Sequence, residues 1–248
     1  MGGKAPVDDM ISVLSDEPSV RRGVLYIVAT PIGNLSDITH RAVETLTSVD
    51  LILCEDTRRT RTLLQRYGIN GRLLSVREHN ERSRAAEMIV RLAEGASLAY
   101  VSDAGTPGIS DPGARLVDSV ANAGFDIIPI PGPSSATALL SVSGFPADRF
   151  VFEGFLPTKS GQRARRLAEL ADEPRTLVFF ESPHRIGRTL TELHVAWGER
   201  RACVGRELTK KFEEIRRGVL SDLAAWAESK TMKGEIVLAV SGKPKSKD

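Results

Sequence analysis

Short apolar runs alternate with longer amphipathic stretches along the first half of the chain. The runs are rich in β-branched, aromatic and other apolar residues, which is typical of buried strands. They span Val24–Thr30, Val49–Cys54, Ser97–Val101 and Phe125–Ile130. Between them, the spacing of apolar residues predicts helices over Ile38–Thr47, with Asp37 as its N-cap, and over Asn80–Glu94. Strands that alternate with helices predict an α/β domain with a parallel sheet.

The second half of the chain carries a different pattern. Its strand-like runs are Phe150–Phe152, Thr176–Phe180, Ala202–Leu208, Phe212–Val219 and Glu235–Val240. The last three show period-2 alternation and Arg-Gly or Lys-Gly turns, which favour antiparallel pairing. We therefore predict two α/β domains, the first with a mostly parallel sheet over 23–131 and the second with a mixed sheet over 132–241. We expect residues 1–22 to be a flexible extension and 242–248 a flexible tail.

Two loops rich in Gly, Pro and Ser follow predicted strands of the first domain. Val101–Gly113 reads VSDAGTPGISDPG, and Pro129–Leu140 reads PIPGPSSATALL. We interpret Asp111 as the N-cap of the helix after the first loop, and Ser134 or Ser135 as the N-cap after the second. In α/β proteins, ligands bind where such loops leave the carboxyl ends of neighbouring strands. We therefore expect both loops to border one cleft.

Composition limits the classes of protein that this chain can belong to. The 248 residues carry a net charge of +2, so a nucleic-acid partner has to be argued from local clusters of charge. Cys54 and Cys203 each lie in an apolar run and are expected to be buried thiols without a metal site. No signal peptide is recognisable, and no apolar run approaches the ~20 residues that span a bilayer, which favours a cytoplasmic protein. The P-loop pattern is absent, which disfavours a nucleotide hydrolase.

Charged side chains cluster after the second predicted strand and on one predicted helix of the second domain. Glu55 and Asp56 stand at the end of that strand, directly before a helix that carries several arginines. Guanidinium groups match phosphate oxygens, so the two basic helices are candidate RNA-binding surfaces. A solvated helix face paired with neighbouring carboxylates is the alternative interpretation. The candidate RNA-binding residues are Arg58, Arg59, Arg61, Arg163, Arg165 and Arg166.

Eight blocks of sequence, in order from about Val24 to Val240, together resemble one family. They are ATPIGNLSDIT, LCEDTRRT, VSDAGTPGISDPG, IPGPSSATALL, FEGFLP, FFESPHRI, GRELTKKFEE and KGEIVL. The chain is similar to the bacterial 16S ribosomal RNA cytidine 2′-O-methyltransferases of the tetrapyrrole-methylase superfamily. The resemblance implies S-adenosylmethionine in a cleft between two α/β domains, and typically a homodimer. It also implies methyl transfer to a ribose 2′-oxygen in the decoding region, on 16S RNA or the small ribosomal subunit, without a DNA or membrane partner.

The same resemblance implies which residues hold the cofactor. Its methionine and ribose parts would lie against Asp103, Gly105, Thr106 and Pro107. The second loop would contribute Pro133, Ser134 and Ser135. The far wall would be formed by Phe180 and Glu181, and the adenine side would be closed by Gly234 and Glu235. An acidic side chain in a Gly-rich loop suits a ligand that carries a sulfonium and an ammonium group.

Methyl transfer to a hydroxyl needs a proton acceptor, and none of the histidines is an obvious one. We favour Glu55 and Asp56 as catalytic residues, because they directly precede arginines that are expected to bind phosphates. Glu181 is a further candidate, and each of the three is alternatively an N-cap or an arginine partner. Two other functions stay open. A precorrin or uroporphyrinogen methylase shares the fold and the cofactor, and an RNA-binding factor without catalytic activity could use the same cleft.

Overall fold

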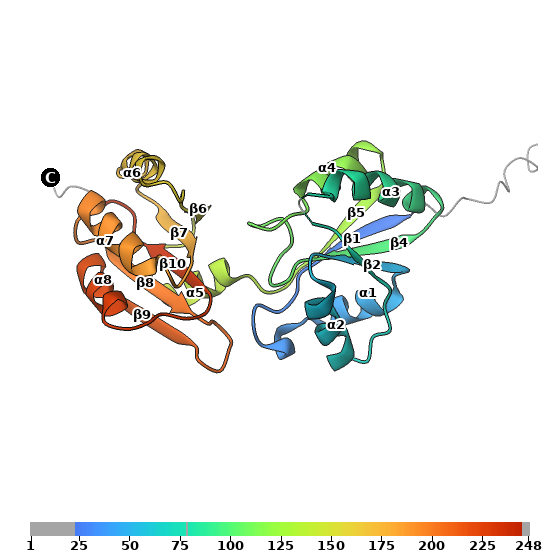
Figure 1. Cartoon of the computed structure of the whole chain (residues 1–248), viewed down its shortest axis with the longest axis horizontal. Coiled ribbons are helices and arrows are strands. Elements are labelled where there is room, and N and C mark those ends of the chain that lie inside the picture. Colours follow the sequence, from blue (N-terminus) through green and yellow to red (C-terminus); the bar gives the residue numbers. More distant parts are fainter. Residues whose placement is uncertain (1–22, 78, 245–248) are drawn as a thin grey trace, which may run out of the picture.

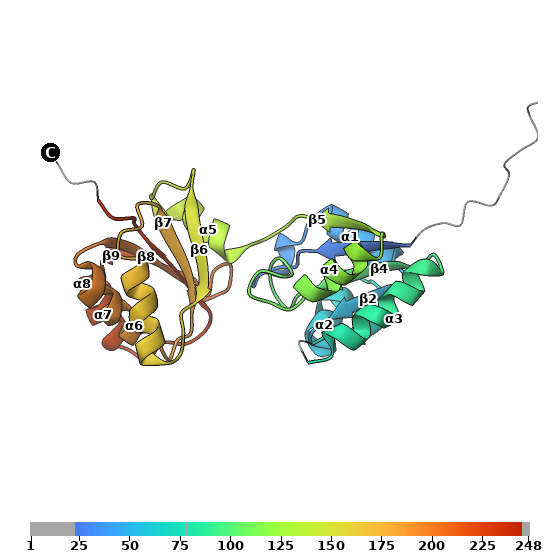
Figure 2. The same ribbon diagram turned by 90° about the horizontal axis from the view of Figure 1, so that it is seen from above.

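The computed structural model describes residues 23–77 and 79–244. In this part of the chain two halves each form a five-stranded sheet, and the segment after β5 connects them (Figures 1 and 2). Strands up to Ile130 build the first sheet, and strands from Phe150 onward build the second. The predicted α/β class with two sheets is therefore confirmed.

The first sheet has the strand order β3-β2-β4-β1-β5, and all of its neighbouring pairs are parallel. Its strands are β1 (Val24–Val28), β2 (Leu51–Cys54), β3 (Leu73–Ser75), β4 (Ser97–Val101) and β5 (Asp126–Ile130). The parallel arrangement agrees with the prediction. The sequence pattern did not indicate β3, because this edge strand has only three residues and all of them are half-buried.

Helices cover both faces of the first sheet (Figure 1). α3 (Glu81–Ala93) and α4 (Ala114–Asn122) pack on one face, and α1 (His40–Ser48) and α2 (Thr57–Arg66) pack on the other. Each pair of helices has its own apolar cluster against the strands. A sheet that is buried on both faces explains why its strands are apolar throughout rather than alternating.

Two helix starts differ from the prediction. Asp37 lies in a short 3-10 helix (Leu35–Asp37), and Thr39 is the residue that caps α1. At α4, the buried Glu81 carboxylate of α3 accepts the backbone N–H groups of Gly113 and Leu116, both at 3.0 Å. This cap comes from a different helix, so a local sequence pattern cannot reveal it. Asp111 is therefore not needed to cap α4.

The second sheet has the order β6-β7-β10-β8-β9, in which only the β6–β7 pair is parallel. Its strands are β6 (Phe150–Phe155), β7 (Thr176–Glu181), β8 (Arg201–Arg206), β9 (Glu214–Val219) and β10 (Ile236–Val240). Its helices are α5 (Ser135–Ser143), α6 (Ser160–Glu169), α7 (Ile186–Trp197) and α8 (Leu220–Glu228). The predicted mixed sheet is confirmed.

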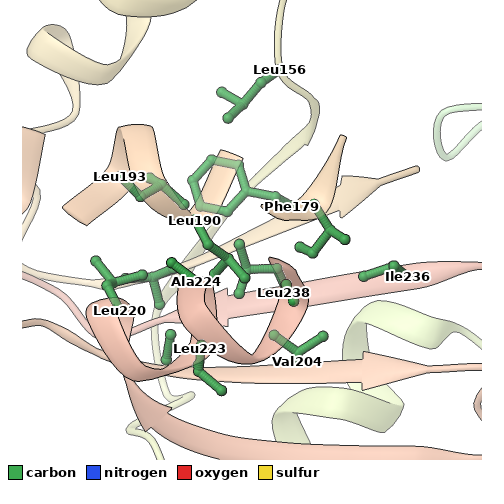
Figure 3. Packing of buried hydrophobic residues seen from close by; sticks show 14 of the residues in the cluster. Leu156, Phe179, Leu190, Leu193, Val204, Leu220, Leu223, Ala224, Ile236 and Leu238 are labelled. Carbon is green, nitrogen blue, oxygen red and sulfur yellow. The ribbon is translucent and has the colours of Figure 1, made fainter. Parts of the chain in front are cut away.

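The core of the second half lies between this sheet and helices α6 to α8. Leu190 and Leu193 of α7 and Leu220 and Leu223 of α8 belong to one buried cluster with Phe179 of β7 (Figure 3). On the opposite face, α5 packs against β8 and β10 in a separate cluster. The second cluster also contains Ile32 from the first half, so it joins the two halves.

Two further expectations from the sequence concern the cysteines and the possibility of membrane-spanning helices. Cys54 and Cys203 are free and buried, as predicted, and burial raises the pKa of both thiols. Among the helices of the described chain, none combines the length and the apolar character needed to cross a bilayer.

Candidate active site

The two halves meet where strands of the first sheet end. Ile32, just after β1, packs with Leu208 in the cluster that joins the halves. The N–H of Asn34 donates to the hydroxyl of Thr209 at 3.0 Å. Between these residues, Gly33 lies so close to Thr209 and its neighbours that a Cβ atom there would overlap them. This contact holds the carboxyl edge of the first sheet against the second half.

A cavity of about 430 Å³ lies at this junction, and both halves line it. Ligand pockets of a few hundred Å³ are typical of cofactor and substrate sites. Of the residues expected to hold a cofactor, those that line this cavity are Asp103, Gly105, Thr106, Ser134, Ser135, Phe180, Glu181, Gly234 and Glu235. These residues lie far apart in the sequence, and the structure brings them together around one space.

The loop after β4 forms one wall of the cavity. Gly105 is paired with Thr30 by two backbone hydrogen bonds of 2.8 and 3.0 Å, and it has a positive φ of 80° that favours glycine. The Thr106 hydroxyl donates to the carbonyl of Pro133 at 3.3 Å, which ties the two Gly-Pro loops together. Pro107 is buried, and Pro133 is half-buried. Neither proline is among the residues that line the cavity.

The opposite wall comes from the second half. The buried carboxylate of Glu181 accepts from the Thr189 hydroxyl at 2.7 Å and lies 3.3 Å from the Arg185 guanidinium. Gly234 has a φ of 90°, and the Glu207 side chain occupies the place where its Cβ would stand. The carboxylate of Glu207 also accepts the N–H of Glu235 at 2.9 Å. These contacts hold the turn before β10 against the cavity.

Acidic side chains dominate the charge of the cavity. Its lining contains Glu55, Asp103, Asp111, Glu181 and Glu235, with Arg59 as the one basic residue among the described residues that line it. The Asp103 carboxylate accepts the backbone N–H of Asp56 at 3.1 Å and lies 3.5 Å from the Arg59 guanidinium. An excess of negative charge favours a ligand that carries positive charge.

Asp111 is a cavity residue that sequence reasoning assigned to a helix cap. Burial, together with the negative charges of Glu55, Asp103 and Glu235, raises the pKa of its carboxyl group to about 6. Groups with such shifted pKa values are common at functional sites. The sequence could have indicated this role, because Asp111 lies in the same Gly-rich loop as Asp103, which was already expected to contact the ligand.

The two carboxylates predicted to be catalytic have different surroundings. Glu55 lines the cavity, whereas Asp56 is not among the lining residues and is the N-cap of α2. The Asp56 carboxylate accepts the N–H of Arg58 at 2.8 Å and pairs with the Arg58 guanidinium at 2.8 Å. These hydrogen bonds hold the pKa of Asp56 well below its usual range, which makes it a poor proton acceptor.

Loops around the cavity contain backbone conformations that are unfavourable for side chains. The described residues other than glycine with positive φ are Ser110, Glu207 and Thr209, at 63°, 51° and 68°. Ser110 lines the cavity directly, and the other two flank the lining residue Leu208. Such conformations cost energy and tend to gather at functional sites.

The predicted basic surfaces are only partly exposed. Arg58 and Arg61 are exposed on α2, and Arg165 is exposed on α6. Arg166 pairs with Glu153 and Glu169, both at 2.8 Å.

Arg163 differs from the expectation. Its side chain is 3% exposed, pairs with Glu192 and donates to the carbonyls of Pro157 and Thr158. Arg163 is therefore a buried structural residue that holds the loop before α6, and it is not part of a phosphate-binding surface. Arg163 precedes the buried Leu167 by four residues, which is about one helical turn. Both side chains therefore lie on the inner face of α6.

The raised pKa of Asp111 predicts a pH-dependent effect on stability. A pKa near 6 in the folded state, above the 3.8 of an unperturbed group, means that ionisation of Asp111 opposes folding. Asp111→Asn is therefore expected to raise the melting temperature at pH 7.5, by about 2–4 °C for each kcal/mol gained. The gain should shrink as pH falls from 6 towards 4. Melting curves at pH 7.5 and 4.5 measure it, with the exposed Asp118→Asn of α4 as control, and an equal gain at both pH values would contradict this reading of Asp111.

Comparison with known proteins places the chain in a family. Residues 24–224 match the Tetrapyrrole (Corrin/Porphyrin) Methylases. A curated relative from Mesorhizobium japonicum, named Ribosomal RNA small subunit methyltransferase I, is 53% identical over 218 residues, which cover 87% of this chain and 74% of that protein. The protein of the same name from Escherichia coli O157:H7 is 50% identical over 224 residues, covering 89% and 78%.

A solved structure supports the same assignment at the level of the fold. The X-ray structure of cobalt precorrin-4 methyltransferase, a cobalamin biosynthetic enzyme, superposes with a TM-score of 0.66 over 87% of this chain and 94% of that chain. Its sequence identity is 21%, so this likeness concerns the fold alone. The chain therefore belongs to the tetrapyrrole methylase family, in the branch whose members carry the name ribosomal RNA small subunit methyltransferase I.

Proposed function

We propose that this chain transfers a methyl group from S-adenosylmethionine to the ribose 2′-hydroxyl of a cytidine in the decoding region of 16S ribosomal RNA. The observation that carries the proposal is 50% identity, over 89% of the chain, to a protein named ribosomal RNA small subunit methyltransferase I. The likeness to the solved cobalt precorrin-4 methyltransferase is far weaker, at 21% identity, and concerns only the fold. The acidic cavity between the two halves supports the proposal independently.

The chemistry of the cavity lining fits the proposed cofactor. When bound, S-adenosylmethionine supplies a methyl group on a positively charged sulfur. Asp103 and Glu181 are the buried or half-buried carboxylates that would balance the charges of its sulfonium and ammonium groups. Ser134 and Ser135 start α5, where backbone N–H groups suit a carboxylate. The aromatic ring of Phe180 and the turn at Gly234 and Glu235 would take the adenine.

Glu55 is the proposed proton acceptor. It lines the cavity close enough to Asp111 for its charge to raise the pKa of that residue. A ribose hydroxyl is far less acidic than a carboxylic acid, so a carboxylate takes its proton effectively only as the oxygen–carbon bond forms. Asp111 is the second choice, because its raised pKa makes it a stronger base than an ordinary aspartate once it is ionised. Asp56 is a weaker candidate than the sequence indicated, since Arg58 already occupies its carboxylate.

The exposed arginines support an RNA partner whose phosphates lie outside the cavity. Arg58 and Arg61 on α2 and Arg165 on α6 present guanidinium groups to solvent from the two halves. The carboxylates inside the cavity repel phosphates, so phosphate contacts belong at this outer surface. The family resemblance further supports a homodimer, and a ribosomal RNA substrate supports a location in the cytoplasm. Sedimentation of the purified chain tests this oligomeric state, and a monomer mass at micromolar concentration would exclude the homodimer.

Mapping the product tests the proposed function. Small ribosomal subunits from a strain that lacks this protein are incubated with the purified chain and methyl-labelled S-adenosylmethionine. We expect one new 2′-O-methyl group on a cytidine of the decoding region, detected by mass spectrometry of nuclease fragments. Uroporphyrinogen III serves as the parallel substrate. Labelling of the tetrapyrrole with none of the RNA would overturn the proposal in favour of the tetrapyrrole methylase.

The proposed proton acceptor makes a kinetic prediction. Glu55→Gln should slow methyl transfer in single turnovers by about 10²–10⁴-fold, which is the usual contribution of a positioned base. Asp56→Asn is the control, because it changes the neighbouring carboxylate without touching the cavity. Both variants should bind cofactor and RNA like the parent. Parental rates in Glu55→Gln together with a large loss in Asp111→Asn would transfer the role to Asp111.

The outer arginines make a prediction about binding. Arg61→Glu and Arg165→Glu should each weaken the affinity for small ribosomal subunits and lower the slope of log affinity against log salt by about one unit per lost phosphate contact. Affinity for S-adenosylmethionine should not change. Arg149→Glu is the control, since Arg149 is exposed at the far end of β6 from the cavity. Equal affinities in all three variants would remove these arginines from the RNA interface.

A further inference from the structure

Two exposed apolar side chains stand at the cavity, one from each half of the chain. The large hydrophobic residues with exposed side chains in the described part are Val90, Ile109, Val142, Phe150, Phe155, Val195 and Phe212. Of these, Ile109 and Phe155 line the cavity, at 44% and 56% exposure. Neither residue was singled out by the sequence, and neither belongs to the proposed cofactor wall. Exposed apolar surface at the edge of a cavity is available to a ligand that enters it.

Phe155 is held in place although most of it is exposed. It is the last residue of β6. The pairing of β6 with β7 shifts register between Phe152 and Gly154 and continues as far as Phe155. Its ring packs against Phe180 at a centroid distance of 5.8 Å and an interplanar angle of 65°. Phe180 is fixed in turn by Phe152, at 4.9 Å and 73°. An aromatic ring that is positioned without being covered is a suitable stacking platform.

The charge of the cavity limits which part of an RNA can enter. Phosphates are repelled by the carboxylates of Glu55, Asp103 and Asp111, whereas a nucleobase is neutral and has apolar faces. Methylation at the ribose 2′-oxygen, as proposed above, brings that ribose to the cavity. The base is attached to the neighbouring ribose carbon, so it must lie within a few bonds of the same place. Phe155 and Ile109 are the apolar surfaces available there.

We propose that Phe155 and Ile109 form the site in which the base of the methylated nucleotide stacks. The inference rests on the proposed function, because it needs RNA at this cavity. Single-stranded bases stack on aromatic side chains in many RNA-binding proteins. The site therefore takes a base that is unstacked from its neighbours, which is cytosine in the proposed target, with Phe155 against one side and Ile109 approaching from the other half of the chain. The protein therefore recognises a nucleotide whose base is exposed, and not one whose base is paired within a duplex.

The test compares three variants of the full chain. Phe155→Ala removes the platform, Phe155→Tyr keeps an aromatic ring, and Phe212→Ala removes a ring that is 66% exposed and does not line the cavity. Affinity for unmethylated small ribosomal subunits is measured by filter binding, affinity for S-adenosylmethionine by calorimetry, and methyl transfer by steady-state kinetics. Phe155→Ala should lose about 10- to 100-fold in RNA affinity and in kcat/KM, which is the usual effect of one stacked base. The other two variants should resemble the parent.

Two other outcomes overturn the inference. If Phe155→Ala binds and methylates RNA like Phe212→Ala, no base stacks on this residue. If its main loss is in affinity for S-adenosylmethionine, Phe155 belongs to the cofactor wall. A parent chain that binds RNA but transfers no methyl group contradicts the proposed function instead, and in that case the RNA affinities of the same variants still decide whether Phe155 stacks on a base.

Discussion

The concentration of negative charge at the junction of the two halves is the constraint on which the site depends. Carboxylates that share a partly buried space repel one another, and the structure compensates several of them locally. Asp103 has a backbone N–H and Arg59, Glu181 has Thr189 and Arg185, and Glu235 lies 3.0 Å from Lys210. Burial is the main cause of the raised pKa of Asp111, and the charges of Glu55, Asp103 and Glu235 act in the same direction. A cation in the cavity would offset these negative charges.

This constraint explains why both halves are needed. The first sheet contributes the loops with Asp103 and Asp111, and the second contributes Glu181 and Glu235, so neither half encloses the cavity alone. Close contact at Gly33 and the shared cluster around Ile32 hold the walls at a fixed separation. Backbone conformations that disfavour side chains, as at Ser110, are tolerated in the loops of this junction. Such conformations cost energy and are common where a site is preorganised.

Local patterns predicted much of this arrangement because they report local physics. Apolar strands and Gly-Pro loops were enough for the parallel sheet and for the edge that carries the cavity. Contacts between distant segments were not predictable in the same way. The Glu81 cap of α4 comes from another helix, and it left Asp111 free to face the cavity. The exposure of Phe155 at the cavity was not predicted, because the bulge at Gly154 interrupts the alternation of side chains along β6. The burial of Arg163 was not predicted either, because the sequence of a basic helix does not distinguish a buried guanidinium from an exposed one.

The acidic cavity between the halves is the proposed binding site of a cationic methyl donor. Isothermal titration of the purified chain with S-adenosylmethionine, with its uncharged-sulfur product S-adenosylhomocysteine, and with ATP measures this most directly. We expect saturable one-site binding of S-adenosylmethionine. The product should bind more weakly at the same pH because the sulfonium charge is gone, and ATP should show no measurable binding because its phosphates meet the carboxylates. Binding of ATP without binding of S-adenosylmethionine would contradict this assignment.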